Sequence, residues 1–300
     1  MGRAKTQKRR RTDRWTIAWA VVLAAVALLA IACSSGSDAT GRLRVVTSLE
    51  LLADMARQVG GDRVDVNAIL PSGADPHTFE AAPGRVADIA RADLLFVNGL
   101  GLEGNLLDVI DQNAGGPVVR LADGLDTIDG NPHLWLDATL AAGYVESIRD
   151  ALIEQDPTGS DAYTANAGAY LDELAALDVE IAEEIDAIPP DSRRLVTFHD
   201  AYPYLARRYG LEIVGFVVPS PGQEPNPGDV ADLVDAIREQ EVRAVFKEPQ
   251  FNASVLEFAA DEADVRVLDL LSDAYTDGVG SYVELMRFNA HQLRKGLGDD

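Results

Sequence analysis

The stretch SGADPHTFEAAPGRVADIARADLLFVNGLGLE, from Ser72 to Glu103, joins a Gly/Pro-rich loop to a helix-like segment and then to an apolar strand. The strand-like part, DLLFVNG at 93–99, is short, rich in Leu and Val, and bounded by turn residues. Near-continuous apolar strands that alternate with helices are typical of a parallel sheet covered on both faces. The stretch therefore predicts an α/β fold.

Strand-like segments of this kind form two sets of four along the chain. Helix-like segments lie between neighbours, for example LLADMARQVG in the first set and DVADLVDAIREQ in the second. Two such sets predict two α/β lobes, which a chain of 300 residues is long enough to form. The strand-like segments are 42–48, 64–70, 93–99 and 117–123, then 193–199, 211–218, 242–249 and 265–270.

A long helix is predicted between the two sets, from Tyr163 to Ile188. Apolar residues recur there every three or four positions, which marks one face of a helix, and Pro189 and Pro190 end the pattern. At 1.5 Å per residue such a helix is roughly 39 Å long, enough to brace both lobes. A plain linking helix with a kink is the alternative. The apolar positions are Leu171, Leu174, Leu177, Ile181, Ile185 and Ile188.

The first 32 residues have the composition of an export signal. A basic segment, MGRAKTQKRRRTDR, precedes an apolar run from Trp15 to Ala32. The single cysteine, Cys33, follows this run, and AIAC resembles the lipobox of bacterial lipoproteins, although Ala30 stands where leucine is usual. The resemblance implies a signal peptide at 1–32, an acylated Cys33 and a flexible tether at 33–42. An uncleaved membrane anchor is the alternative, and both place the folded part at the outer face of the cytoplasmic membrane.

The charge of the chain excludes one class of partner. The net charge of −23 argues against nucleic-acid binding, which needs basic surface. It suits an exposed surface protein or one with a cationic ligand. The hydrophobic content of 47% and the charged content of 25% are ordinary for a globular protein.

Three of the four histidines stand in loops or at strand ends. His77 lies in DPHTF, His133 in NPHLW, and His199 in TFHDAY at the end of an apolar strand, whereas His291 lies on the last helix-like segment. Open α/β sheets bind ligands beyond the carboxyl ends of their strands, and neutral imidazole suits Zn²⁺ and Mn²⁺. The pattern predicts a divalent metal site that loses affinity below about pH 6, where histidine takes up a proton.

A divalent ion needs an anionic ligand as well. Asp269, at the end of VRVLDL, is the predicted one, because its strand belongs to the same set as that of His199. Asp273 and Asp277, in SDAYTDG, are weaker candidates.

Neighbouring groups are predicted to serve the site indirectly. Asp137 and Asp200 are expected to be helix caps or acceptors for the ligand histidines. Glu248 is expected in a structural salt bridge, and Trp135 in core packing beneath the His133 loop. The turn-rich segment PSPGQEPNPGD at 219–229 is expected to border the cleft or a permease contact.

Four motifs in order carry a resemblance to the substrate-binding lipoproteins of zinc and manganese ABC importers. They are DPHTFE…ADLLFVNGLGLE, NPHLWLD, TFHDAYPYLARRYGLEIVG and VFKEPQFN. The resemblance runs from about Arg44 to the C-terminus. It implies two (β/α)4 lobes with parallel four-stranded sheets, at 43–158 and 189–300, joined by one long rigid helix at 159–188.

The resemblance also implies one metal ion in the cleft between the lobes. His77, His133, His199 and Asp269 fall on the family's four ligand positions. The protein would then act as a monomer that delivers its ion to a permease in the cytoplasmic membrane, driven by an ATPase.

Zinc is the predicted ion, because three nitrogen ligands suit Zn²⁺ better than Mn²⁺. Manganese receptors of this family often have a glutamate where this chain has His199, so manganese is the alternative. The short segment GPVVRLADGLDTIDG lacks the histidines of the loop found in many zinc receptors.

Three further classes of function are alternatives to a metal receptor. A surface adhesin is compatible with a metal-binding lipoprotein. A receptor for haem or a siderophore would need an aromatic-lined cleft, which an aromatic content of 6% does not favour. An enzyme is not expected, because H-E-x-x-H and G-x-S-x-G motifs are absent from the sequence.

Overall fold

The computed structural model describes residues 41–299. The predicted signal peptide and the acylated Cys33 lie outside the described residues, as does most of the predicted tether. Among the described helices, none combines the length and the apolar character that crossing a membrane requires.

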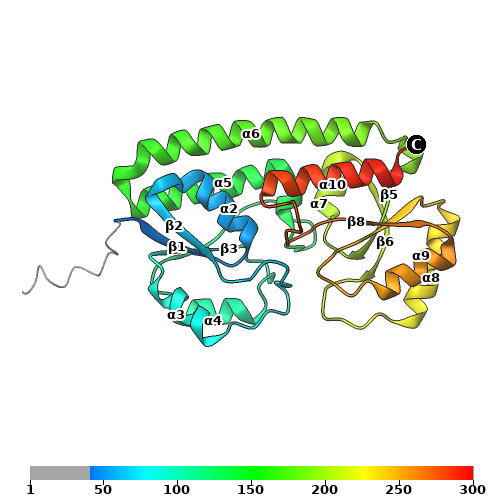
Figure 1. Ribbon diagram of the computed structural model, residues 1–300, viewed down its shortest axis with the longest axis horizontal. Helices are drawn as coiled ribbons and strands as arrows, with labels where there is room; N and C mark the ends of the chain where they lie inside the picture. Colours follow the sequence, from blue (N-terminus) through cyan, green and yellow to red (C-terminus); the bar gives the residue numbers. More distant parts are fainter. Residues whose placement is uncertain (1–40, 300) are drawn as a thin grey trace, which may run out of the picture. The chain divides into compact units, whose positions relative to one another are not determined.

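The first sheet contains four parallel strands in the order β2-β1-β3-β4 (Figure 1). The inner strands β1 and β3 are the most apolar, and every residue of β3 is buried. This explains why their sequences are nearly continuous runs of Val, Leu and Phe. The strands are β1 (Leu43–Thr47), β2 (Val64–Ala68), β3 (Leu94–Val97) and β4 (Val118–Arg120).

The second sheet repeats this arrangement with the order β6-β5-β7-β8, again fully parallel. Each sheet and the helices that follow its strands form one lobe, called here the first lobe (β1 to β4) and the second lobe (β5 to β8). The predicted two α/β lobes with four parallel strands each are confirmed. The strands are β5 (Arg194–His199), β6 (Glu212–Val218), β7 (Ala244–Lys247) and β8 (Arg266–Asp269).

Helices cover both faces of each sheet. In the first lobe α2 and α5 lie on one face and α3 and α4 on the other, and in the second lobe α8 and α9 lie opposite α7 and α10 (Figure 1). The helices are α2 (Glu50–Gly60), α3 (Pro83–Arg91), α4 (Asn105–Asn113), α5 (Ala138–Gln155), α7 (Pro203–Tyr209), α8 (Pro227–Glu239), α9 (Ser254–Ala263) and α10 (Tyr282–Leu297).

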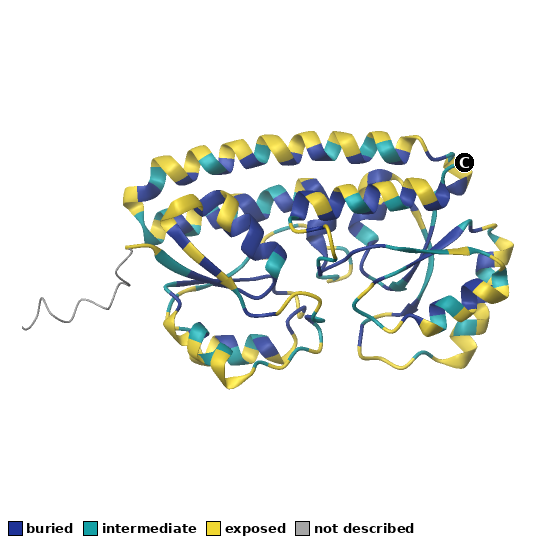
Figure 2. Cartoon of the chain, in the orientation of Figure 1, coloured by how far each residue is buried: buried dark blue, intermediate teal, exposed yellow. Residues whose placement is uncertain are grey.

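The long helix α6 (Ser160–Asp186, 27 residues) runs between the two sheets in the sequence and packs on helices of both lobes. Its predicted apolar face is buried at Leu174, Leu177, Ile181 and Ile185, and buried and exposed residues alternate along it in Figure 2. One hydrophobic core includes residues of the first lobe, α6, α10 and the second sheet. A smaller core lies between the second sheet and helices α8 and α9. The shared core makes α6 a brace for both lobes.

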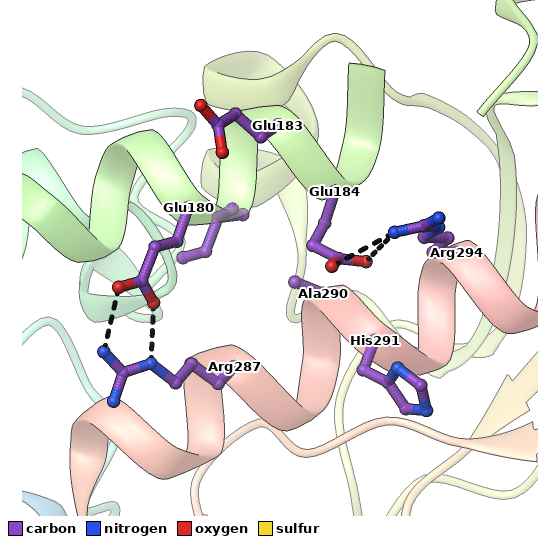
Figure 3. A pocket seen from close by; sticks show the side chains of 8 residues that line it. Glu180, Glu183, Glu184, Arg287, Ala290, His291 and Arg294 are labelled. Carbon is purple, nitrogen blue, oxygen red and sulfur yellow. Dashed lines mark hydrogen bonds and ion pairs between the residues drawn. The ribbon is translucent and has the colours of Figure 1, made fainter. Parts of the chain in front are cut away.

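Two ion pairs join α6 to α10 along this brace. Arg287 binds Glu180 and Arg294 binds Glu184, as the dashed lines in Figure 3 show. Both pairs are about half exposed, so each contributes little beside the apolar contact beneath them. His291, also labelled in Figure 3, lies on α10 beside Arg294 in the groove between the two helices.

Candidate metal site

Three histidines and one aspartate meet between the lobes. One ligand atom from each of His77, His133, His199 and Asp273 lies within 4.8 Å of the corresponding atoms of the other three. His77 follows β2, His133 follows β4, His199 ends β5 and Asp273 follows β8. All four therefore come from the carboxyl ends of strands, which is the edge where open α/β sheets bind ligands.

The carboxylate in this cluster is Asp273, and the structure does not bring Asp269 into it. Asp269 is the last residue of β8, aligned with Lys247 on β7. Glu257 chiefly, and Asp269 to a lesser extent, raise the pKa of Lys247, so the Asp269 carboxylate faces a cation of its own sheet. The cleft lies beyond the strand end, and the chain reaches it four residues later, at Asp273, which is 4% exposed. Asp277 is also outside the cluster.

The three imidazole rings lie close together. The Nε2 atoms of His133 and His199 are 3.3 Å apart, and the His77 ring centroid lies 5.4 Å from that of His133 and 5.6 Å from that of His199. Among the described residues, Nε2 of His77 and Oδ2 of Asp273 are buried without a hydrogen-bond partner. Such atoms are rare in folded proteins. A cation held by all four groups would satisfy them.

Two of the rings are oriented through their second nitrogen. Nδ1 of His133 lies 2.9 Å from Oδ1 of Asn131, and Nδ1 of His199 lies 2.6 Å from Oε2 of Glu248. Both acceptors are oxygens, which assigns the proton of each neutral ring to Nδ1. The lone pair on Nε2 of each ring is then directed into the cluster, as metal ligation requires.

The loop after β7 supports His199 and Asp273, the two cluster residues that belong to the second lobe. Glu248 is fully buried and accepts a hydrogen bond from the hydroxyl of Ser272, and Gln250 donates from Nε2 to Oδ1 of Asp273 at 2.9 Å. The indole of Trp135 in the first lobe donates to the carbonyl of Ser272 at 2.7 Å. The expected salt bridge of Glu248 is therefore made with His199.

The expected packing role of Trp135 is also found. Trp135 is fully buried, and its ring centroid lies 5.3 Å from that of His133. Its indole hydrogen bond to the second lobe adds a polar contact to this packing.

Burial and mutual charge set the protonation of the cluster. Burial and the neighbouring His199 lower the pKa of His77 to about 4, and burial lowers the pKa of His133 well below its usual value. Burial and the Glu248 charge raise the pKa of Asp273 to about 8. Burial alone would lower the pKa of His199, but the charge and hydrogen bond of Glu248, together with the charges of Asp273 and Asp75, raise this pKa above its usual value. At neutral pH His77 and His133 are therefore neutral, whereas Asp273 holds a proton that a cation must displace.

The NGLGLE motif holds the loops of the first lobe in place. Glu103 is fully buried and accepts hydrogen bonds from the Ser48 hydroxyl at 2.8 Å and from the backbone N–H of Asn98 at 2.6 Å. Asn98 in turn donates from Nδ2 to the carbonyl of Pro132 at 2.9 Å, next to His133. This arrangement fixes the loop that carries His133.

The predicted accessory groups Asp137 and Asp200 follow His133 and His199 in the sequence. Asp137 caps α5, where it accepts from the Thr139 backbone N–H at 2.9 Å. Asp200 does not cap α7, whose N-cap residue is Tyr202. The backbone carbonyl of Asp200 accepts from Nδ2 of Asn131 at 2.6 Å, so Asn131 joins the two lobes. The turn-rich segment after β6 lies against the His77 loop. Gly222 is so close to Thr78 that a Cβ added at Gly222 would lie 2.9 Å from the Thr78 methyl group. That segment therefore borders the cleft.

Sequence reasoning missed Asn131 and Gln250. Each lies two residues from a group that it did single out, Asn131 before His133 and Gln250 after Glu248. Asn131 belongs to the NPH motif and Gln250 to the KEPQ motif, so both could have been noticed beside the residues already singled out. The hydrogen-bond partner of each side chain, however, depends on loops far away in the sequence.

The chain is similar to known proteins over most of its length. Residues 45–296 match the family model described as ZnuA, zinc-uptake complex component A, periplasmic. The manganese-binding lipoprotein MntA of Halalkalibacterium halodurans is 33% identical over 298 residues, covering 94% of this chain and 98% of that one. The iron-binding protein YfeA of Yersinia pestis is 30% identical over 287 residues, covering 91% and 92%.

A solved structure shows the same fold. The periplasmic zinc binding protein TroA from Treponema pallidum superposes with a TM-score of 0.82 at 27% identity, covering 86% of this chain and all of that one. The names of these relatives specify manganese, iron and zinc, so the likeness identifies a metal-binding scaffold without selecting one ion.

Proposed function

The chain belongs to the family of metal-binding, substrate-binding lipoproteins of zinc and manganese ABC importers, and from this premise we propose that it captures Zn²⁺ in preference to Mn²⁺. The family is the binding component of a transporter and not an enzyme. The ion is cargo, taken up outside the cytoplasmic membrane and delivered to a permease.

The observation that carries the choice of zinc is the composition of the cluster. Three imidazole nitrogens and one carboxylate oxygen form a set of four ligand atoms. Zn²⁺ is commonly bound by four ligands in a tetrahedron, with histidine nitrogen among its preferred donors. Mn²⁺ prefers more oxygen ligands in a larger shell. In this proposal His77, His133, His199 and Asp273 are the ligands.

Release of the ion requires that the cluster come apart. His77 and His133 belong to the first lobe, and His199 and Asp273 to the second. A permease that separates the lobes would therefore halve the ligand set and lower the affinity steeply. Acylation of Cys33 would keep the protein at the membrane beside that permease.

Manganese is the second candidate. It is favoured by the similarity to MntA, a relative named for manganese binding that matches nearly the whole chain. A zinc receptor and a manganese receptor would have the same fold and would differ in how tightly the cluster binds each ion.

Competitive titration of the metal-free chain with Zn²⁺ and Mn²⁺ tests the proposal. We expect one ion per chain, with zinc bound more tightly, and at least tenfold weaker zinc binding in His199→Ala, a change of about 1.4 kcal/mol. His291→Ala is the matched control, because His291 is a histidine outside the cluster. Wild-type affinity in His199→Ala would remove this residue from the site. Tight manganese binding that zinc displaces poorly would favour the manganese receptor.

A further inference from the structure

The two carboxylate oxygens of Asp273 have different surroundings. Oδ1 accepts a hydrogen bond from Nε2 of Gln250 at 2.9 Å. Oδ2 is buried, and within residues 41–299 it has no hydrogen-bond partner. The carboxylate is thus turned so that one oxygen is engaged by an amide and the other is available to the histidine cluster.

The loop that carries Gln250 is held on several sides. The backbone N–H of Phe251 donates to the carbonyl of Glu248 at 3.1 Å, which closes a tight turn around Gln250. The Phe251 ring packs against Phe198 at 5.2 Å and against His199 at 5.5 Å between centroids. The amide of Gln250 also lies 3.4 Å from the hydroxyl of Ser272. Gln250 is therefore placed by contacts that do not involve the ion.

We propose that Gln250 is a specificity-determining residue that limits Asp273 to one coordinating oxygen, Oδ2. This inference rests on the proposed function. If both oxygens were to bind an ion, Oδ1 would have to turn toward the ion, which would weaken its hydrogen bond with Gln250. The half-buried amide would then keep only the more distant Ser272 hydroxyl as an acceptor, which costs free energy. Four ligand atoms suit Zn²⁺, whereas ions that prefer a larger shell lose the additional oxygen.

The test compares the wild-type chain with Gln250→Met, which keeps a similar length and volume but removes the donor. We expect the ratio of manganese to zinc dissociation constants to fall about tenfold in Gln250→Met, because Asp273 becomes free to offer both oxygens. Co²⁺ serves as a spectroscopic probe. Its intense visible absorption in the wild-type chain, typical of four-coordinate cobalt, should weaken in the variant as the coordination number rises.

The matched control is Gln58→Met. Gln58 also donates to a buried aspartate, Asp54, but neither residue belongs to the metal cluster. The control should leave both the ratio and the cobalt spectrum unchanged.

The outcomes separate this inference from the function on which it rests. A wild-type chain that binds none of the three ions would overturn the proposed function and this inference with it. Wild-type binding with an unchanged ratio and spectrum in Gln250→Met would overturn only the role of Gln250. An equal loss of affinity for both ions would overturn it too, since Gln250 would then support the loop without selecting the ion. A wild-type cobalt spectrum of a five-coordinate ion would also contradict the inference.

Discussion

Nδ1 of His199 lies 2.6 Å from Oε2 of Glu248, and both side chains are fully buried. A buried carboxylate is costly unless it is paired and hydrogen-bonded, and Glu248 is both, through His199 and the hydroxyl of Ser272. The pair does two things for the cluster. It keeps the proton of His199 on Nδ1, and it places a negative charge directly behind this ring, where it offsets part of the charge of an incoming cation.

Glu248→Gln should weaken zinc binding by about tenfold to a hundredfold while the protein remains folded. The amide has nearly the same shape but no charge, and its NH₂ group can donate to Nδ1, which would put the His199 proton on Nε2 and block ligation. Competitive titration measures the affinity, and circular dichroism checks the fold. Glu257→Gln is the control, because Glu257 pairs with Lys247 outside the cluster. Equal zinc affinities in the two variants would exclude a role for the buried charge.

Asp273→Asn should weaken zinc binding at least tenfold and yet stabilise the metal-free protein at pH 8. The pKa of Asp273 is about 8 in the folded protein and near 3.8 in the unfolded chain. The unfolded state therefore loses this proton at lower pH, and stability declines as the pH rises from about 4 to 8. Asparagine removes this penalty, which we expect to amount to about 1 kcal/mol or more. Thermal unfolding of the metal-free proteins measures it.

Asp269→Asn provides the comparison for that experiment. Asp269 faces Lys247 and is outside the cluster, so its substitution should leave zinc affinity within about twofold of the wild type. If Asp269→Asn abolished zinc binding and Asp273→Asn did not, the ligand expected from the sequence would be right and the cluster assigned from the structure wrong.

The difference between Asp269 and Asp273 shows where sequence reasoning stops. Apolar runs identified all eight strands of the described chain, and a strand end marks the edge of the sheet where ligands bind. That was enough to single out His77, His133 and His199. It was not enough for the aspartate, because the path of the loop after β8 decides which of its carboxylates turns inward, and no local pattern specifies that path.

The helix α6 shows a similar limit at smaller scale. Its apolar periodicity predicted the helix and its buried face, but the helix begins three residues earlier than predicted, at Ser160, directly after a short 3-10 turn. It ends at Asp186, before Ile188, which is buried outside the helix.

The contacts of Asn131 and Gln250 could not be predicted from the sequence for another reason. They join segments separated by 69 and 23 residues, and only the folded chain brings these together.

Zinc affinity should begin to fall as the pH drops below about 8, at a higher pH than free imidazole alone would give. Asp273, with a pKa of about 8, and His199, whose pKa is raised, take up protons that compete with the ion. His77, with a pKa of about 4, and His133, whose pKa is also lowered, stay neutral and do not compete in this range. Titrations at several pH values between about 8.5 and 5.5 measure the slope, and calorimetry in two buffers of different ionisation enthalpy counts the protons released. Affinity that stays constant from pH 8 to pH 6 would contradict the raised pKa values.

Gly104→Ala should lower both the stability and the zinc affinity of the protein. Gly104 has φ +48° and ψ −128°, a conformation that L residues avoid, and a Cβ there would lie 2.8 Å from the carbonyl oxygen of His77. The backbone strain should cost about 1–3 kcal/mol, and the close contact should displace the His77 loop and weaken zinc binding severalfold. Gly124→Ala is the matched control, because Gly124 has φ +81° but nothing within 4 Å of the added methyl group. Thermal unfolding and zinc titration of both variants separate the two effects. Strain alone lowers stability in each, whereas only Gly104→Ala should lose affinity. Equal affinities would mean that the backbone at Gly104, directly after the NGLGLE motif, does not position His77.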